Sequence, residues 1–299
     1  MADPQTSIGE PLSRRTVIGR IGAAVSAVAL APAVAFGQGA QPVTSYDPRR
    51  NYDPAADPVS YPDPDIVTID PAFNALRVNN TAIHRLWTGG QWCEGPAWSS
   101  QGKYLVWSDI PNNRQMRWLD DDQRVTVFRT PSNNSNGNTF DFQGRQLSAE
   151  HSGRRIVRYE HDGSITVVAD AWNGMRLNSP NDLAPHRDGS IWFTDPPFGI
   201  RGNYEGFKSA SETKPAVYRV DKNGQMDLLT DEMSGPNGIC FTPDYKKVYI
   251  ADTIGQETRI YDIDGGKIRN GKRFVKLDMP GTSQPAAADG IRCDTDGNL

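Results

Sequence analysis

The sequence predicts an all-β chain folded as a β-propeller, and three observations predict it. Short runs of β-branched and aromatic residues alternate with Asp-Gly, Asn-Gly or Pro-containing turns, as strands and hairpins do. These runs recur in register along the chain. No segment keeps a helical period over a dozen residues. A repeat of about 40–50 residues with several strands in each unit is typical of propeller blades.

Each repeat opens with a side chain that carries an oxygen and runs through a turn into a second strand. The five starts stand 44, 43, 56 and 52 positions apart: Glu94, Asn138, Asn181, Asn237 and Asp289. The second strand of the first four repeats closes on an acid: Asp109, Glu150, Asp195 and Asp252. Because these acids recur alike, we expect them to accept hydrogen bonds from turn amides as part of the scaffold. Further strands are expected at 115–119, 125–128, 155–159, 165–168, 216–220, 226–229, 259–262 and 272–277.

The fifth repeat stops after its first strand, at Leu299. A propeller must close its ring, because an open blade exposes unpaired strand edges. The sequence therefore predicts a truncated propeller, which lacks the C-terminal part of blade five and the last blade. We expect 82–87 to pair with that missing blade. The predicted regions are a signal segment (1–35), an extended lead-in (36–80) and the propeller domain (81–299).

The first 35 residues have the features of an export signal. Ser13-Arg14-Arg15 precedes an apolar run from Ile21 to Phe36, and Ala33-Val34-Ala35 has the small residues of a cleavage site. The run is shorter than the roughly 20 residues that span a bilayer, so a stable membrane anchor is not expected. The paired arginines are similar to a twin-arginine signal, which predicts a periplasmic or extracellular protein.

The net charge and the cysteine content indicate which partners and which covalent links to expect. The net charge of −4 offers no basic stripe for phosphates, so nucleic acid is not an expected partner. Three cysteines, Cys93, Cys240 and Cys293, are an odd number without CxxC spacing. An oxidising compartment would allow one bridge, but we expect three small core-like residues. The oligomeric state is not indicated by the sequence.

The starting residues of successive blades meet near a propeller's axis. Their carboxylate and amide oxygens, without His or Cys, form a set that suits a hard cation. Glu94 and Asp289 supply two negative charges, which match a divalent ion. Zinc is disfavoured, because the four histidines show no ligand spacing. The bland alternative is that Asn and Asp merely build turns, but it explains Glu94-Gly95-Pro96 poorly, since Glu is no turn former.

Four motifs in order resemble the gluconolactonase/regucalcin (senescence marker protein) family over roughly residues 85–299. They are Glu94-Gly95-Pro96-Ala97-Trp98, Asn178-Ser179-Pro180-Asn181-Asp182-Leu183, Gly235-Pro236-Asn237-Gly238-Ile239 and Ala288-Asp289-Gly290-Ile291-Arg292-Cys293-Asp294. The resemblance implies six blades around a channel with one divalent ion, usually calcium. It implies the ligands Glu94, Asn181, Asn237 and Asp289. Asn138 matches no ligand of the family and is predicted to line the channel and bind substrate.

The resemblance also implies hydrolysis of sugar lactones. A cation-bound lactone carbonyl is polarised and its oxyanion stabilised, and Asp289 is the expected general base for water. His151 is predicted to bind substrate hydroxyls or shuttle protons, with simple filling of a loop as the equal alternative. Two other functions stay open: organophosphate or ester hydrolysis at the same ion, and a non-catalytic propeller that binds a ligand. Gly-x-Ser-x-Gly, P-loop and GxGxxG motifs are absent.

Overall fold

A computed structural model describes residues 50–53, 55–56, 60–277 and 286–299. The expected export signal and the first part of the lead-in lie outside these residues. The only helices in the described part are two short 3-10 turns, η1 (Pro71–Ala75) and η2 (Phe198–Ile200). A search of the same residues found no helix with the length and apolar character needed to cross a membrane. The all-β prediction is confirmed.

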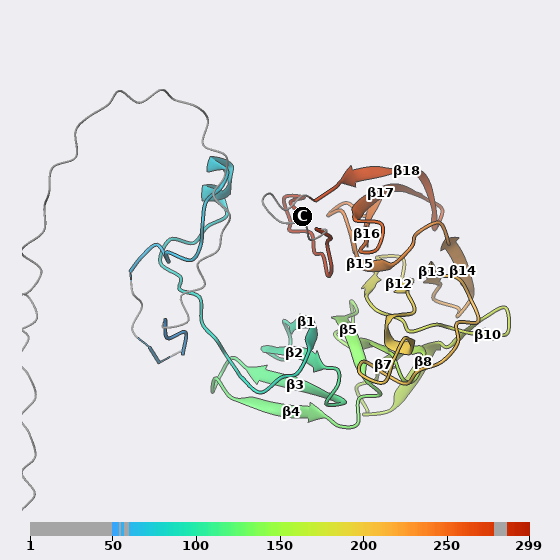
Figure 1. Cartoon of the computed structure of the whole chain (residues 1–299), viewed down its shortest axis with the longest axis horizontal. Coiled ribbons are helices and arrows are strands. Elements are labelled where there is room, and N and C mark those ends of the chain that lie inside the picture. Colours follow the sequence, from blue (N-terminus) through green and yellow to red (C-terminus); the bar gives the residue numbers. More distant parts are fainter. Residues whose placement is uncertain (1–49, 54, 57–59, 278–285) are drawn as a thin grey trace, which may run out of the picture. The chain divides into compact units, whose positions relative to one another are not determined.

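Four sheets of four strands make up the described β structure, and each is an antiparallel meander in sequence order (Figure 1). The first holds β1 (Cys93–Ser99), β2 (Tyr104–Asp109), β3 (Arg114–Leu119) and β4 (Val125–Arg129). The second holds β5 (Ser135–Phe140), β6 (Gln146–Glu150), β7 (Arg155–Tyr159) and β8 (Ile165–Ala169). The third holds β11 (Leu183–Pro185), β12 (Ile191–Asp195), β13 (Ala216–Val220) and β14 (Met226–Thr230). The fourth holds β15 (Pro236–Phe241), β16 (Lys247–Asp252), β17 (Glu257–Asp264) and β18 (Lys267–Val275), and a hairpin of β9 (Ala171–Trp172) and β10 (Met175–Arg176) follows the second sheet.

The predicted strands and the observed ones agree within a few residues at their ends. Turn residues and apolar alternation fix these boundaries locally, which is why they could be read from the sequence. The fifth repeat differs, because no strand is assigned to residues 286–299. Residues 82–87 are likewise without strand structure. The number of blades and the pairing of 82–87 stay predictions.

Successive sheets contact one another through their first strands. β1 and β2 contact β5, β5 contacts β11, and β11 and β12 contact β15. Main-chain hydrogen bonds reinforce this order, with Gly137 N donating to Asn181 O at 2.8 Å and Gly238 N to Asp289 O at 3.2 Å. Gly95 shows why glycine is needed at such a contact, since an added Cβ would lie 2.1 Å from Asn136 O. The repeats therefore meet backbone to backbone.

The core lies between neighbouring sheets. Leu147 and Ile156 of the second sheet pack with Phe193 and Tyr218 of the third in one buried cluster. A further cluster joins Trp192 and Val217 of the third sheet to Ile239, Val248 and Ile250 of the fourth. The third sheet is thus packed on both faces, and the first strands are held in place around the site described next.

Candidate functional site

The register of the sheets defines one equivalent position in each repeat. The first strand is interrupted by a bulge at this position, with register shifts between Glu94 and Ala97, Ser135 and Asn138, and Pro236 and Ile239. Bulges re-aim side chains at such points. We call the residues at this position, with their counterparts in the third and fifth repeats, the oxygen ring: Glu94, Asn136, Asn181, Asn237 and Asp289.

The second member of the oxygen ring is Asn136, whereas the spacing of the repeats predicts Asn138. The Asn138 side chain is completely buried. Its oxygen accepts from Gln115 Nε2 at 3.1 Å and Ser148 Oγ at 2.9 Å, and its nitrogen donates to Gly95 O at 3.0 Å. Asn138 therefore lies inside the sheet and not among the residues that line the pocket. The sequence does contain a pattern that identifies Asn136, because a glycine follows it directly, as a glycine follows Glu94, Asn237 and Asp289.

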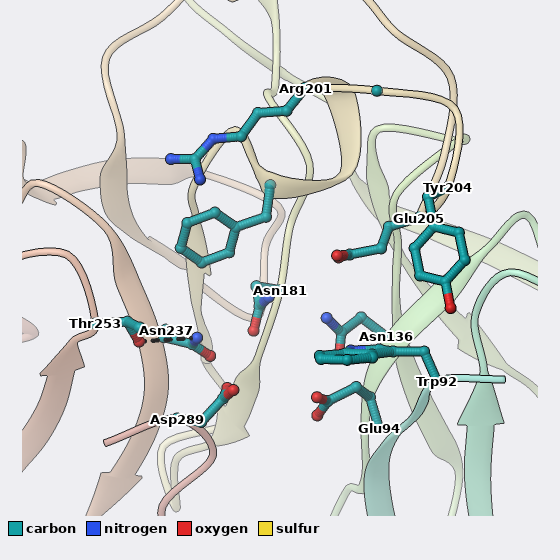
Figure 2. A pocket seen from close by; sticks show the side chains of 12 residues that line it. Trp92, Glu94, Asn136, Asn181, Arg201, Tyr204, Glu205, Asn237, Thr253 and Asp289 are labelled. Atoms are coloured by element: carbon teal, nitrogen blue, oxygen red, sulfur yellow. Dashed lines mark hydrogen bonds between the residues drawn. The ribbon is translucent and has the colours of Figure 1, made fainter. Parts of the chain in front are cut away.

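The oxygen ring opens into a pocket of about 440 Å³. Figure 2 shows the side chains of Glu94, Asn181 and Asp289 pointing into this space from different parts of the chain. One wall is formed by residues between Phe198 and Glu205, and we call the segment that carries them the pocket loop (198–209). The pocket is lined by Trp92, Glu94, Asn136, Asn181, Phe198, Arg201, Gly202, Tyr204, Glu205, Asn237, Thr253 and Asp289.

Burial and neighbouring carboxylates raise the pKa values of the three acids in this pocket. Burial, together with the charges of Asp289 and Glu205, raises the pKa of Glu94 to about 7. Burial and the charge of Asp289 raise the pKa of Glu205. Partial burial and the charge of Asp182 raise the pKa of Asp289, and the Asn237 amide opposes this rise. The residue still has an exposed surface. A cation among these groups would relieve the repulsion.

The donor chemistry of the oxygen ring fits a hard divalent cation. Its side chains offer only carboxylate and amide oxygens, the atoms that calcium and magnesium prefer. In the described part of the chain, no group of three or more His, Cys, Asp or Glu side chains is arranged to hold a metal. The oxygen ring differs from a cluster of His, Cys, Asp and Glu side chains, because three of its five members are asparagines. The fit thus rests on amide oxygens as much as on charge.

His151 lies behind the pocket wall. Its side chain is completely buried, with Nδ1 3.0 Å from the Glu205 backbone oxygen and Nε2 3.4 Å from Asn136 Nδ2. Burial lowers the pKa of His151 to about 4, so the ring is neutral. Both ring nitrogens have protein partners, and His151 is not among the lining residues. Of the roles predicted for His151, the geometry favours the filling of space under a loop over direct binding of substrate hydroxyls.

A second cavity of about 300 Å³ shares all five members of the oxygen ring and extends to Asp182 and Arg292. Arg292 Nη1 donates to Asp182 Oδ2 at 2.8 Å and Nη2 to Asp182 Oδ1 at 3.1 Å. Asp182 Oδ2 also accepts from Ile239 N at 3.1 Å. Asp182 takes the place that glycine has in the other repeats. Its carboxylate links the third repeat to the fourth and the fifth.

The closing acids accept hydrogen bonds from the segments that lead into the oxygen ring, as expected of scaffold residues. In three repeats the acid accepts from the backbone N–H three residues before the ring member: Gln91 to Asp109 at 3.0 Å, Asn178 to Asp195 at 2.8 Å, and Ser234 to Asp252 at 2.9 Å. In the second repeat the Asn133 side chain donates to Glu150 at 3.0 Å. In all four sheets the closing acid thus accepts from the residue three positions before the ring member.

The family model for the SMP-30/Gluconolactonase/LRE-like region matches residues 92–299. The chain belongs to this family. Among its relatives is the gluconolactonase of Zymomonas mobilis, 28% identical over 253 residues, which cover 78% of this chain and 70% of that protein. The diisopropyl-fluorophosphatase of Loligo vulgaris is 27% identical over 69% of this chain and 70% of its own length.

Solved structures of the SMP-30/gluconolactonase family share the fold. A gluconolactonase from Xanthomonas campestris superimposes with a TM-score of 0.64 at 35% identity, over 71% of this chain and 70% of that one. The recognition of the family from its motifs is therefore confirmed. All the members of the oxygen ring lie within the matched region.

Proposed function

We propose that this chain hydrolyses sugar lactones in the pocket above the oxygen ring, with one bound divalent cation. The observation that carries the proposal is the convergence of five side-chain oxygens on one pocket. Membership of the SMP-30/gluconolactonase family and the similarity to two gluconolactonases support the reaction class. Calcium is the proposed ion, because a set of carboxylate and amide oxygens suits its flexible coordination.

Glu94, Asn181, Asn237 and Asp289 would hold the cation. When bound, the ion would supply Lewis-acid polarisation of the lactone carbonyl and stabilise the oxyanion. Asp289 is the proposed general base: it takes a proton from water, whose oxygen bonds to the carbonyl carbon. The ring C–O bond of the lactone then breaks, and the proton passes to the leaving alkoxide. The Asn237 amide nitrogen donates to Thr253 Oγ1 at 3.0 Å, which would leave the amide oxygen for the cation.

The pocket provides groups that suit a sugar. Glu205 offers an acceptor for hydroxyl groups, and Tyr204 and Trp92 offer aromatic faces beside it. Aromatic faces pack against the C–H faces of sugar rings while polar edges orient the hydroxyls. We infer that the pocket loop selects the substrate and the oxygen ring performs the reaction.

The test compares Asp289→Asn with Asp296→Asn, an exposed acid in the same segment. The Asp289 variant should bind calcium and lose at least about 100-fold in lactone-opening rate, the typical worth of a general base. The Asp296 variant should keep its rate. Chelation should abolish turnover and added calcium restore it. Undiminished turnover of Asp289→Asn would remove this residue from the mechanism.

Organophosphate hydrolysis is the second candidate, because a relative of similar coverage is named for that activity. Assay of one preparation against sugar lactones and diisopropyl fluorophosphate decides between them. Faster turnover of the organophosphate, measured as kcat/KM, would favour the second candidate.

We also propose export by the twin-arginine route, from the motif Ser13-Arg14-Arg15 and the apolar run after it. Replacing both arginines by lysine should keep the protein in the cytoplasm. Continued export of that variant would assign the segment to another route.

A further inference from the structure

His151 connects two parts of the pocket that are far apart in sequence. One ring nitrogen contacts the backbone of the pocket loop, and the other contacts the oxygen ring at Asn136. The imidazole is completely buried between them. A side chain in this place can fix the geometry of both without meeting a substrate.

The Glu205 carbonyl decides which nitrogen of His151 carries the proton. A backbone oxygen can only accept, so Nδ1, at 3.0 Å, must donate. In a neutral imidazole the other nitrogen is then an acceptor. Nε2 therefore accepts from the Asn136 amide nitrogen at 3.4 Å.

This contact sets the orientation of the Asn136 amide. Because the nitrogen is used by His151, the amide oxygen is the atom left for the pocket. That oxygen takes part in no hydrogen bond within the described part of the chain, although Asn136 is only 6% exposed. A flipped amide would place its NH₂ toward the carboxylates and face His151 with an acceptor.

The pocket loop is packed onto the same imidazole. A Cβ added to Gly199 would lie 2.4 Å from His151 Cγ, and one added to Gly206 would lie 3.4 Å from His151 Cβ. Ser209 N donates to Ile200 O at 3.0 Å, which closes the loop on itself. The imidazole thus fills the space under a closed loop that carries five lining residues.

We propose that His151 is a positioning residue that fixes the Asn136 oxygen toward the pocket and anchors the pocket loop over the oxygen ring. Its kinetic consequence rests on the proposed lactone hydrolysis, whereas its structural consequences do not. Asn136 then adds a fifth oxygen to the set that holds cation and substrate.

The direct test is the tautomer of His151 in the unaltered protein. Nitrogen NMR of protein labelled in its four histidines, with the signal identified by its loss in His151→Asn, should show a proton on Nδ1 and none on Nε2. A proton on Nε2 would overturn the proposal. This measurement needs neither a substrate nor a stable variant.

Two substitutions separate the two contacts. The amide of His151→Asn lies near the place of Nδ1 and keeps a donor for Glu205, whereas that of His151→Gln reaches the place of Nε2 and keeps an acceptor for Asn136. Trypsin should therefore cleave after Arg201 or Lys208 about tenfold faster in His151→Gln, because cleavage follows the open population of the loop. Cleavage after Lys222, in an exposed turn outside the loop, is the internal control. Equal loop cleavage in the two variants would contradict the anchoring role.

A kinetic test measures the KM of His151→Asn and asks whether a second substitution restores it. His151→Asn should raise the KM for a sugar lactone about tenfold, since one oriented hydrogen bond is worth roughly 1–1.5 kcal/mol. Adding Asn136→Asp should recover most of this loss, because a carboxylate presents an oxygen in either orientation. Unchanged KM in His151→Asn, or no recovery in the double variant, would overturn the role of Asn136. If unaltered protein turned over no lactone, the proposed function would fail while the tautomer and cleavage results still decided the role of His151.

Discussion

Two asparagines only two residues apart have different tasks in this molecule. Asn136 faces the pocket from the bulge of β5, and Asn138 lies beyond the bulge inside the sheet. Asn138 is held by Gln115, Ser148 and Gln146, among others. A residue type therefore does not reveal its role here until its place relative to the bulge is known.

Alanine at each position should separate the two roles. Asn138→Ala leaves several buried polar groups without partners and should lower the free energy of unfolding by about 3 kcal/mol. Asn136→Ala should lower it by about 1 kcal/mol or less and should weaken lactone hydrolysis instead. Urea denaturation and steady-state kinetics of the two variants provide the check, and equal losses of stability would argue against the assignment.

At the scale of the element, each sheet uses its closing acid to hold the segment that leads to the oxygen ring. The Asp252 carboxylate accepts from three backbone N–H groups, Ser234 N, Gly235 N and Gly255 N, at 2.8–2.9 Å. The sheet thereby orients the side chain of Asn237 through its main chain. The same carboxylate connects the start of β15 to the turn after β16.

Removing this carboxylate should loosen the fourth sheet. Asp252→Ala leaves three backbone N–H groups without their acceptor and should destabilise the fold by about 3 kcal/mol. Asp231→Ala, which breaks only an exposed ion pair with Lys214, should cost less than about 1 kcal/mol. A comparison of denaturation midpoints tests this, and similar midpoints for both variants would contradict it.

The closing acid of the third sheet should make stability depend on pH. Burial raises the pKa of Asp195 to about 7 from its ordinary value of 3.8. Between these two pKa values the folded state binds the proton of Asp195 more tightly than the unfolded state does. The stability that this protonation contributes is therefore fully present below pH 4 and is lost as the pH rises through 7.

We therefore expect Asp195→Asn to flatten the stability profile between pH 4 and pH 7. Denaturation across this range should show a fall with rising pH in the unaltered protein and a smaller fall in the variant. Asp231→Asn, at an ion pair on the surface, is the matched control. Parallel profiles for all three proteins would show that Asp195 does not titrate as described.

For the whole molecule, local patterns predicted the sheets well and long-range packing less well. β7 and β13 have the bounds that the turns and apolar alternation gave, because strand ends are set by neighbours in sequence. The site was predicted for Glu94, Asn181, Asn237 and Asp289, which line one pocket. Asn136 was missed because a bulge moves the register, and the burial of His151 because the pocket loop that covers it comes some fifty residues later.

Calcium should stabilise the whole fold if the oxygen ring holds it. An ion that binds only the folded state stabilises it by about 2.7 kcal/mol at a concentration of 100 times its Kd. The melting temperature should rise with calcium concentration, and much less so in Glu94→Gln. A melting temperature that does not respond to calcium would count against the proposed cation.

The main-chain carbonyls of the oxygen ring are occupied with assembly. Asn181 O and Asp289 O accept from Gly137 N and Gly238 N, and Asn237 O accepts from Thr194 Oγ1 at 2.7 Å. The carbonyl groups of these residues thus join neighbouring repeats, and reactivity is left to their side chains. An ancestor of such a chain could acquire a new catalytic repertoire by exchanging those groups, without redesigning the joints between its sheets.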